Sequence, residues 1–337
     1  MPDELTELRT AVAGLTAGGD FDGLALRIFR FQRRHNPTYR RWLDLSGQLV
    51  REPQTWREIP CLPIDFFRSH DLRSGRWQPE TTFTSSGTTG AATSSHPVID
   101  LRQYRSLCRA TFEHAVGRPL VDFRLLALLP SYLERSGSGL IAMVEGFIEH
   151  SAGGSGFFLY DHDGLRQAVD DAAAEGQAVL LWGVPYALLD LLESDALVLP
   201  AGSVVVETGG MKGRRRELIR EELHKRLQAG IRLRDGRPAP ILSEYGMTEM
   251  NSQAYRLPER GSFAPAAALR VAVRDQTDPF ASLPFGKTGA LNVYDLANVA
   301  TCSFIQTDDL GRLYADGTFD LLGRQDGARV RGCNLLV

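Results

Sequence analysis

The sequence contains little cysteine, and its basic residues are dispersed rather than gathered in an arm. Four cysteines in 337 residues, Cys61, Cys108, Cys302 and Cys333, show no C-x-x-C spacing. A chain of this length does not depend on disulfides, so a reducing cytoplasm is the simplest location. The formal net charge of -3 is close to neutral. We therefore expect no role in binding nucleic acid or an anionic membrane.

Long hydrophobic runs are also missing. The most apolar stretch, 178–200, is interrupted by Pro185, Asp190, Glu193 and Asp195, so it is not expected to span a bilayer. The N-terminus, Met1-Pro2-Asp3-Glu4, is acidic where a signal peptide would be basic. With 43% hydrophobic residues the chain can still bury a large core. These features predict a soluble intracellular protein.

The hydrophobic pattern predicts an α/β fold. Apolar residues recur at helical spacing through a region of about sixty residues at the N-terminus, as Leu24, Ile28 and Phe31 illustrate. From 123 to 228, short apolar strands alternate with helices, which indicates a parallel sheet with helices on its faces. The last third reads as antiparallel strands, with turns marked by Gly286, Asp308-Asp309 and Asp316-Gly317. We expect a helical region over 1–60, a catalytic domain over 61–322 and a tail over 323–337.

One loop combines small hydroxyl residues with two glycines: Thr84-Ser85-Ser86-Gly87-Thr88-Thr89-Gly90. Glycine lets the backbone approach a ligand closely. Short hydroxyl groups and free N–H groups in such a turn form a concave anion site. The loop therefore favours binding of nucleotide phosphates, although an isolated loop of this kind is more often a solvated turn.

Three later stretches carry complementary chemistry. Tyr245-Gly246-Met247-Thr248-Glu249 offers a ring for stacking, a hydroxyl for phosphate and a carboxylate for Mg²⁺. Thr307-Asp308-Asp309 presents carboxylates that can accept from ribose hydroxyls, and Gly323-Arg324-Gln325-Asp326 adds a guanidinium. Each stretch alone is a weak signal, but the order of all of them along the chain is a strong one.

In this order the motifs resemble those of the adenylate-forming superfamily, which includes acyl-CoA synthetases and firefly luciferase. Residues 85–90 are similar to its phosphate loop, 245–249 to its Y-G-x-T-E motif and 307–309 to its T-G-D motif. Residues 284–291 resemble its P-x-G-x-x-G-x-L turn, and 323–326 its hinge motif G-R-x-D. The resemblance covers roughly 55–337 and implies the large N-terminal domain of these enzymes, with mixed and parallel sheets flanked by helices and a smaller β-rich subdomain.

The resemblance also implies the site. It assigns ATP to Ser85, Ser86, Gly87, Thr88, Thr89, Gly90, Gly209, Gly210, Met211, Tyr245, Gly246, Thr248, Asp309 and Arg324. Tyr245 would lie against adenine, Thr248 near the α-phosphate, and Asp309 with Arg324 at the ribose. Glu249 would hold Mg²⁺. The acid would lie near Trp182, Gly183 and Gly210, in an apolar pocket suited to a fatty or an aryl acid.

The sequence departs from the superfamily pattern in two places, and these narrow the group of enzymes that it resembles. The phosphate loop continues with Ala91-Ala92-Thr93 where the family has Pro-Lys, and the sequence ends at Val337, shortly after the hinge motif. We therefore expect no folded C-terminal lid. Residues 331–337 and 207–212 are similar to the acyl-protein synthetases of bacterial bioluminescence, the LuxE family. This resemblance implies that Cys333 accepts the acyl group and passes it to a reductase partner, with coenzyme A as the alternative acceptor.

Several other interpretations compete with this one. Gly137-Ser138-Gly139-Leu140-Ile141-Ala142 fits a dinucleotide-binding pattern, but residues 131–136 separate it from the preceding strand. A Walker A motif fails because Ala281 stands where a glycine is needed. An acyl-CoA or aryl-acid ligase, or a degenerate adenylate-former that binds acyl groups or nucleotides without turnover, remains an alternative. The histidines suggest no metal cluster, and we interpret most as surface residues: His96, His114, His150, His162 and His224.

Overall fold

The computed structural model describes residues 3–48, 51–85, 93–130, 137–193, 195–209 and 218–325. The chain forms two compact units. The first contains the described parts of 1–111, 246–254 and 264–331, and the second those of 112–245 and 255–263. No helix in these described ranges is both long enough and apolar enough to cross a bilayer.

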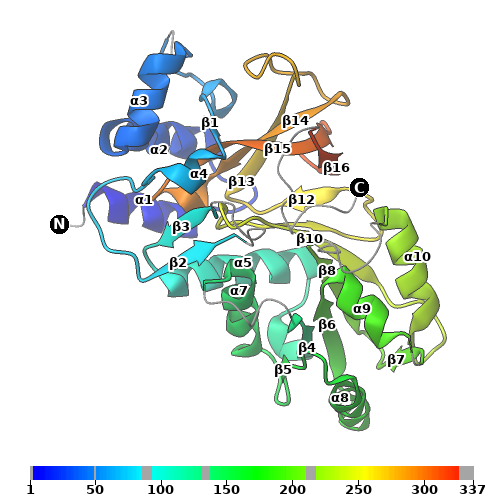
Figure 1. Ribbon diagram of the computed structural model, residues 1–337. Coiled ribbons are helices and arrows are strands. Elements are labelled where there is room, and N and C mark those ends of the chain that lie inside the picture. Colours follow the sequence, from blue (N-terminus) through cyan, green and yellow to red (C-terminus); the bar gives the residue numbers. More distant parts are fainter. Residues whose placement is uncertain are drawn as a thin grey trace. The chain divides into compact units, whose positions relative to one another are not determined.

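The second unit contains a parallel sheet with the strand order β10-β8-β6-β4-β5 (Figure 1). Strands β4 and β6 are buried along their whole length, as expected where helices cover both faces of a parallel sheet. Helix α8 packs on β4 and β6, while α9 packs on β8 and α10 on β10. The bounds are β4 Phe123–Leu128, β5 Gly156–Phe157, β6 Ala178–Gly183, β8 Val204–Thr208, β10 Ile241–Tyr245, α7 Gly139–Ile148, α8 His162–Ala174, α9 Pro185–Leu191 and α10 Arg220–Gly230.

Short pieces complete this unit. Strands β7 (Leu197–Leu199) and β9 (Ile231–Leu233) pair in parallel as a separate ribbon. Asp161 begins α8 because its carboxylate accepts from the Gly164 N–H at 2.9 Å, which satisfies a free donor of the first turn. The alternation of strands and helices predicted from the sequence is thereby confirmed in this part of the chain.

The first unit contains antiparallel strands in the order β13-β14-β15-β16. Strand β1 pairs in parallel with β15, and β2 and β3 form a separate hairpin. The bounds are β1 Leu62–Pro63, β2 Thr81–Thr84, β3 Ser95–Val98, β13 Leu269–Arg274, β14 Thr288–Asp295, β15 Phe304–Leu313 and β16 Phe319–Arg324. Strands β11 (Ala254–Arg256) and β12 (Phe263–Pro265) lie where the chain passes from one unit to the other.

The N-terminal helices belong to the first unit. They are α1 (Glu4–Ala13), α2 (Phe21–His35) and α3 (Pro37–Ser46), followed by the turn η1 (Trp56–Glu58) and α4 (Phe66–Ser69). Helix α2 buries Leu24, Ile28 and Phe31, as its spacing predicts. Its buried Gln32 donates to the carbonyls of Asn298 and Val299, both at 3.1 Å, so the helix is joined to a loop far along the chain. Helix α5 (Leu101–Val116) spans both units.

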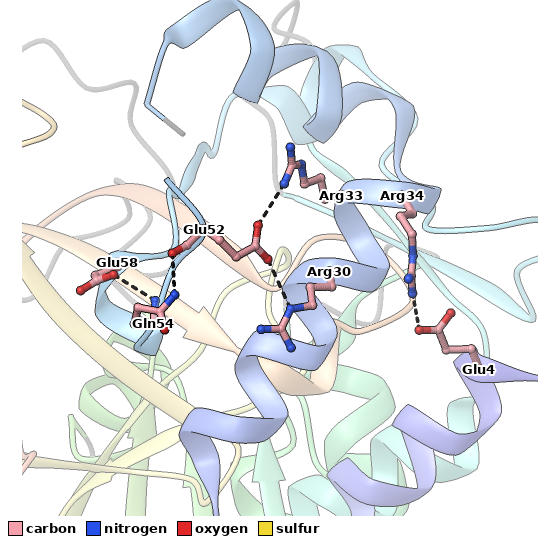
Figure 2. A network of polar contacts seen from close by, with 7 residues as sticks. All are labelled: Glu4, Arg30, Arg33, Arg34, Glu52, Gln54 and Glu58. Carbon is pink, nitrogen blue, oxygen red and sulfur yellow. Dashed lines mark hydrogen bonds and ion pairs between the residues drawn. The ribbon is translucent and has the colours of Figure 1, made fainter. Parts of the chain in front are cut away.

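Ion pairs hold the segment after α3 against α2. Figure 2 shows Glu52 between Arg30 and Arg33, at 3.3 and 3.1 Å, while Arg34 pairs with Glu4 on α1. The Glu52 pairs are about half exposed, so each contributes little to stability, on the order of 0–1 kcal/mol. Their main effect is to position the segment that leads to η1, and they add little to the stability of the unit.

Two local predictions are wrong. Asp308 and Asp309 do not form a turn but lie within β15, where a bulge disturbs the pairing with β14. Pairing with strands on both sides outweighs the local turn preference of the Asp-Asp sequence. The strand expected over 157–160 ends at Phe157, because Leu159 adopts a left-handed backbone with φ of 51°.

Candidate functional site

Three parallel strands of the second unit bring predicted site residues to one edge of the sheet. Gly183 of β6 lies opposite Glu207 of β8, and Thr208 of β8 lies opposite Glu244 of β10. The carboxyl ends of these neighbouring strands therefore meet at one place. Ligands of parallel sheets bind at such an edge.

Trp182 and Gly183, predicted near the acid, lie at the end of β6 in an aromatic core. The Trp182 ring contacts Phe147, Phe112 and Tyr255 with centroids 5.5, 5.8 and 6.3 Å away. Its indole N–H is buried without a hydrogen-bond partner among the described residues. A Cβ at Gly183 would come within 2.8 Å of the Leu188 side chain, so packing requires a glycine there. The surroundings of Trp182 are apolar, and its side chain is fully buried.

The residues predicted around the nucleotide base are only partly described. Tyr245 ends β10 and is buried, with its ring centroid 6.1 Å from that of Phe263. Gly209 follows β8 with φ of 79°, a conformation that favours glycine. Gly210 and Met211 lie outside the described residues. The stacking role of Tyr245 stays a prediction.

A cluster of polar residues at this edge was missed by the sequence analysis. We call Glu207, Thr208, His224 and Glu244 the carboxylate cluster. The Thr208 hydroxyl donates to the Glu244 carboxyl, and His224 Nε2 lies 3.3 Å from Glu207 Oε1. Burial, together with the negative charge of Glu207, raises the pKa of Glu244 to about 7. The His224 side chain is only 15% exposed, so His224 is not among the histidines at the surface.

This cluster does not form a Ser-His-Glu relay. The Ser243 hydroxyl lies 3.3 Å from His224 Nε2, which is the same nitrogen that contacts Glu207. A relay needs the acid on one ring nitrogen and the nucleophile on the other. The cluster instead places a carboxyl group that titrates near neutrality at the carboxyl ends of β8 and β10.

The loop that contains Thr248 and Glu249 is held within the first unit by three buried side chains. We call Asp295, Asn298 and His96 the brace. His96 Nδ1 lies 2.8 Å from the Thr248 carbonyl oxygen, and the Asn298 amide donates to the Glu249 carbonyl at 2.7 Å. His96 is fully buried, so it is not among the histidines at the surface either. The brace fixes the backbone of both predicted site residues.

Asp295 is the most connected member of the brace. Its carboxylate accepts from the backbone N–H groups of Asn251, Ser252 and Ala297, at 2.8, 2.9 and 3.0 Å. It also accepts from the Ser252 hydroxyl at 2.6 Å. Glu249 itself is only 2% exposed, and its backbone carbonyl is held by Asn298 of the brace.

Asp309 and Arg324, predicted together at the ribose, are brought together by the structure. They are direct partners across β15 and β16, with Arg324 Nε 3.5 Å from Asp309 Oδ1. Arg324 also donates to Asp308 at 2.8 Å. Because Asp309 is buried beside a guanidinium, its carboxylate is oriented rather than free to rotate. The sequence had suggested this pair only through the resemblance.

Ser85 closes the base of the predicted phosphate loop. Its hydroxyl accepts from the Ser94 N–H at 2.9 Å, and its own N–H donates to the Ser94 carbonyl at 3.1 Å. The predicted phosphate loop thus connects the two strands of the β2–β3 hairpin. Its remaining predicted residues, Ser86, Gly87, Thr88, Thr89 and Gly90, lie outside the described residues, as does Cys333. Within the ranges the structure does describe, no three His, Cys, Asp or Glu side chains are grouped to hold a metal ion.

Comparison with known proteins identifies the fold. No family model and no curated protein matches the sequence. Solved structures do match at 15–20% identity, among them O-succinylbenzoate coenzyme A synthetase from Bacillus subtilis in complex with AMP (19% identity, TM-score 0.52, 74% of this chain and 63% of that one). A long-chain-fatty-acid-CoA ligase from Archaeoglobus fulgidus is 15% identical with a TM-score of 0.52, covering 72% of this chain and 51% of that one. ATP-bound MatB from Rhodopseudomonas palustris is 20% identical with a TM-score of 0.50, covering 72% and 47%.

These likenesses concern the fold. The chain spans about half to two thirds of the length of the solved structures it matches. Its mixed α/β architecture is that of the N-terminal domain of adenylate-forming enzymes, as the motifs predicted.

Proposed function

We propose that this protein uses ATP and Mg²⁺ to convert a carboxylic acid into an acyl adenylate, and that it then transfers the acyl group to Cys333. The observation that supports this most directly is the meeting of β6, β8 and β10 at one edge, where the predicted acid and nucleotide residues end their strands. The fold is shared with proteins solved with ATP or AMP. We place the reaction in the cytoplasm.

The described residues fit the nucleotide and the metal. Asp309 offers an oriented carboxylate to a ribose diol, and Arg324 holds it in place at 3.5 Å. Glu249 would hold Mg²⁺, because carboxylate oxygen is a ligand this hard cation accepts. When bound, the metal would neutralise charge on the phosphates. Thr248 would donate its hydroxyl near the α-phosphate, on a backbone fixed by His96.

The first step joins acid and nucleotide. A carboxylate oxygen of the acid attacks the α-phosphorus of ATP, the new P–O bond forms, and pyrophosphate leaves with the electrons of the bond that breaks. The buried, apolar surroundings of Trp182 would exclude water from the acid. They are compatible with a fatty or an aryl acid, and the matched structures include ligases named for each class.

The second step transfers the acyl group to a thiol. The Cys333 thiolate attacks the acyl carbon, AMP leaves, and a thioester forms. The three described cysteines are poorly suited to this step because all are buried. Burial raises the pKa values of Cys61 and Cys302 to about 12, so their thiolate fractions at neutral pH are very small. The thioester then passes to a partner acyl reductase, with coenzyme A as the alternative acceptor.

The two steps can be tested separately. A panel of fatty and aryl acids is assayed by ATP–pyrophosphate exchange, which reports the first step alone. With the best acid in labelled form, Cys333→Ser should keep the exchange but lose the hydroxylamine-labile label on the protein. Asp309→Ala should weaken ATP binding more than Asp309→Asn, since asparagine keeps one acceptor oxygen.

Each alternative gives its own result. If no acid supports exchange, the protein is a binding module rather than an enzyme. Label that remains on Cys333→Ser, or that maps to Cys302, would show that the acceptor is assigned wrongly. Release of labelled acyl-CoA when coenzyme A is added, with no labelled protein, would identify a coenzyme A ligase.

A further inference from the structure

The first unit contains a cavity that the proposed reaction does not use. It encloses about 340 Å³ and is lined by the segment 51–61, the loop 279–282 and strands β14 and β15. Pockets for small molecules typically enclose roughly 300–1,000 Å³ and combine apolar walls with a few polar groups. The volume of this cavity falls in that range. Its lining is mainly polar, with Arg57 and Asn292 among the polar groups, and Pro60, Pro279 and Phe280 supply its apolar part.

Arg57 supplies the charge of the cavity. Its guanidinium lies over the Trp56 ring, 4.6 Å from the centroid, and 5.2 Å from the centroid of Phe285. Within the described part of the chain it has no carboxylate at ion-pair distance. The rings hold the guanidinium in position without neutralising it. Arg57 is therefore an exposed positive charge with no ion-pair partner among the described residues.

The other ionisable groups of the lining leave this charge uncompensated. Arg51 and Glu58 pair with each other at 3.3 Å. Burial raises the pKa of the Cys61 thiol to about 12 and that of the Tyr294 hydroxyl well above its usual range, so both are neutral at pH 7. A ligand that carries one negative charge would balance the lining.

A second polar group of the lining narrows the range of ligands that the cavity could bind. The side-chain oxygen of Asn292 is buried and accepts no hydrogen bond from the described residues. An unsatisfied buried acceptor is unfavourable, and a ligand hydroxyl or N–H would satisfy it. Phe280 also lines the cavity and is 53% exposed, so it offers apolar surface to the body of a ligand.

The cavity and the predicted ribose position involve different residues of β15. Along this strand partly exposed residues alternate with buried ones. Gln306, which lines the cavity, belongs to the partly exposed set, whereas Asp309 is buried. Gln306 pairs with Asn292 of β14, whereas Asp309 pairs with Arg324 of β16. A ligand that contacts Gln306 and Asn292 therefore uses other residues than ATP at Asp309.

We propose that this cavity is a second binding site, for a small organic acid whose apolar body also carries a hydroxyl or N–H donor. The carboxylate binds the Arg57 guanidinium, the donor reaches Asn292, and the body packs against Phe280 and the prolines. This inference is independent of acid activation, because it requires neither ATP nor Cys333.

The test is calorimetric titration of the full chain, without ATP, using 4-hydroxybenzoate as the probe. Benzoate lacks the donor, and inorganic phosphate lacks the apolar body. We expect 4-hydroxybenzoate to bind more tightly than either. Arg57→Gln should weaken it by about tenfold or more, the effect of losing a charge-assisted hydrogen bond. Asn292→Ala should lower its affinity to that of benzoate, while benzoate itself is unaffected.

Controls separate binding from folding. Arg237→Gln removes one positive charge from an exposed site in the second unit and should leave binding unchanged. Arg57→Lys keeps the charge but loses the planar fork, so its affinity should be intermediate, and thermal unfolding verifies that each variant is folded. Affinity for 4-hydroxybenzoate that is equal in the parent protein and Arg57→Gln overturns the proposal, as does the absence of binding or a preference for phosphate.

Discussion

The brace in the first unit and the carboxylate cluster in the second are both buried polar networks, but their hydrogen bonding and charge differ. In the brace, one carboxylate accepts four hydrogen bonds and the imidazole and amide hold backbone carbonyls. In the cluster, two carboxyl groups lie close together, and the pKa of Glu244 rises to about 7. A network whose acceptors are matched to backbone donors fixes a loop. In the cluster, burial above all, and then the charge of Glu207, brings the pKa of Glu244 near neutrality.

The largest effect is expected at the centre of the brace. Asp295→Ala should lower the free energy of unfolding by about 4 kcal/mol, because three backbone N–H groups and a hydroxyl lose their buried acceptor. Urea denaturation at pH 7 measures this. Asp295→Asn keeps one acceptor oxygen and should lose about half as much. A loss below about 1 kcal/mol for Asp295→Ala would show that the loop relaxes without the brace.

His96 should come next, and its contribution should depend on pH. Burial lowers the pKa of His96 from 6.5 to about 4, so the neutral ring is the folded form. Because the folded pKa is depressed, the stability contributed by the neutral ring is present above pH 6.5 and is lost as the pH falls towards 4. His96→Ala should cost about 3 kcal/mol at pH 7. Its deficit relative to the parent protein should shrink as the pH falls from 6.5 to 4.

Comparison of unfolding curves at pH 7.5 and 4.5 gives the measurement, and His162→Ala, at the start of α8 in the second unit, serves as the control. A deficit for His96→Ala that is the same at both pH values would mean that the imidazole is not buried in its neutral form. Asp295 acts in the opposite direction, since burial raises its pKa. The His96 effect is therefore read as a difference between variant and parent.

The comparison of the brace with the carboxylate cluster also shows which features the sequence could predict. The apolar spacing in α2 and the continuous apolar runs of β4 and β6 depend on neighbours in the chain, and these elements form as expected. The brace could not be found in this way, because His96 contacts a residue 152 positions away. Glu207 and Glu244 become neighbours only because β8 and β10 are adjacent in the sheet while a helix separates them in sequence.

The cluster should respond to pH in the opposite sense to His96. The pKa of Glu244 is raised from 4.5 to about 7 in the folded state. Its protonated form therefore contributes stability below pH 4.5, and this contribution is lost as the pH rises through 7. Glutamine at this position is neutral at every pH, so Glu244→Gln should not lose stability as the pH rises. Its free energy of unfolding at pH 8 should exceed that of the parent by about 2 kcal/mol.

The measurement is the difference in free energy of unfolding between parent and Glu244→Gln at pH 5 and pH 8. It should be near zero at pH 5 and clearly positive at pH 8. Glu222→Gln, on the partly exposed surface of α10, should show no such change. A difference that does not grow with pH would mean that Glu244 is already ionised in the folded protein at pH 5.

The smallest effect is expected from Thr301→Val, which tests whether His96 needs its second partner. The Thr301 hydroxyl lies 3.0 Å from His96 Nε2. Since the Thr248 carbonyl can only accept, Nδ1 carries the proton, and Nε2 accepts from Thr301. Valine keeps the shape of threonine and removes this donor, so the free energy of unfolding should fall by about 1 kcal/mol. In the double variant with His96→Ala the effect of Thr301→Val should nearly vanish, because the acceptor is already gone. If the two losses simply add, the hydroxyl acts through its contact with the Asn298 carbonyl at 3.4 Å and does not orient the ring.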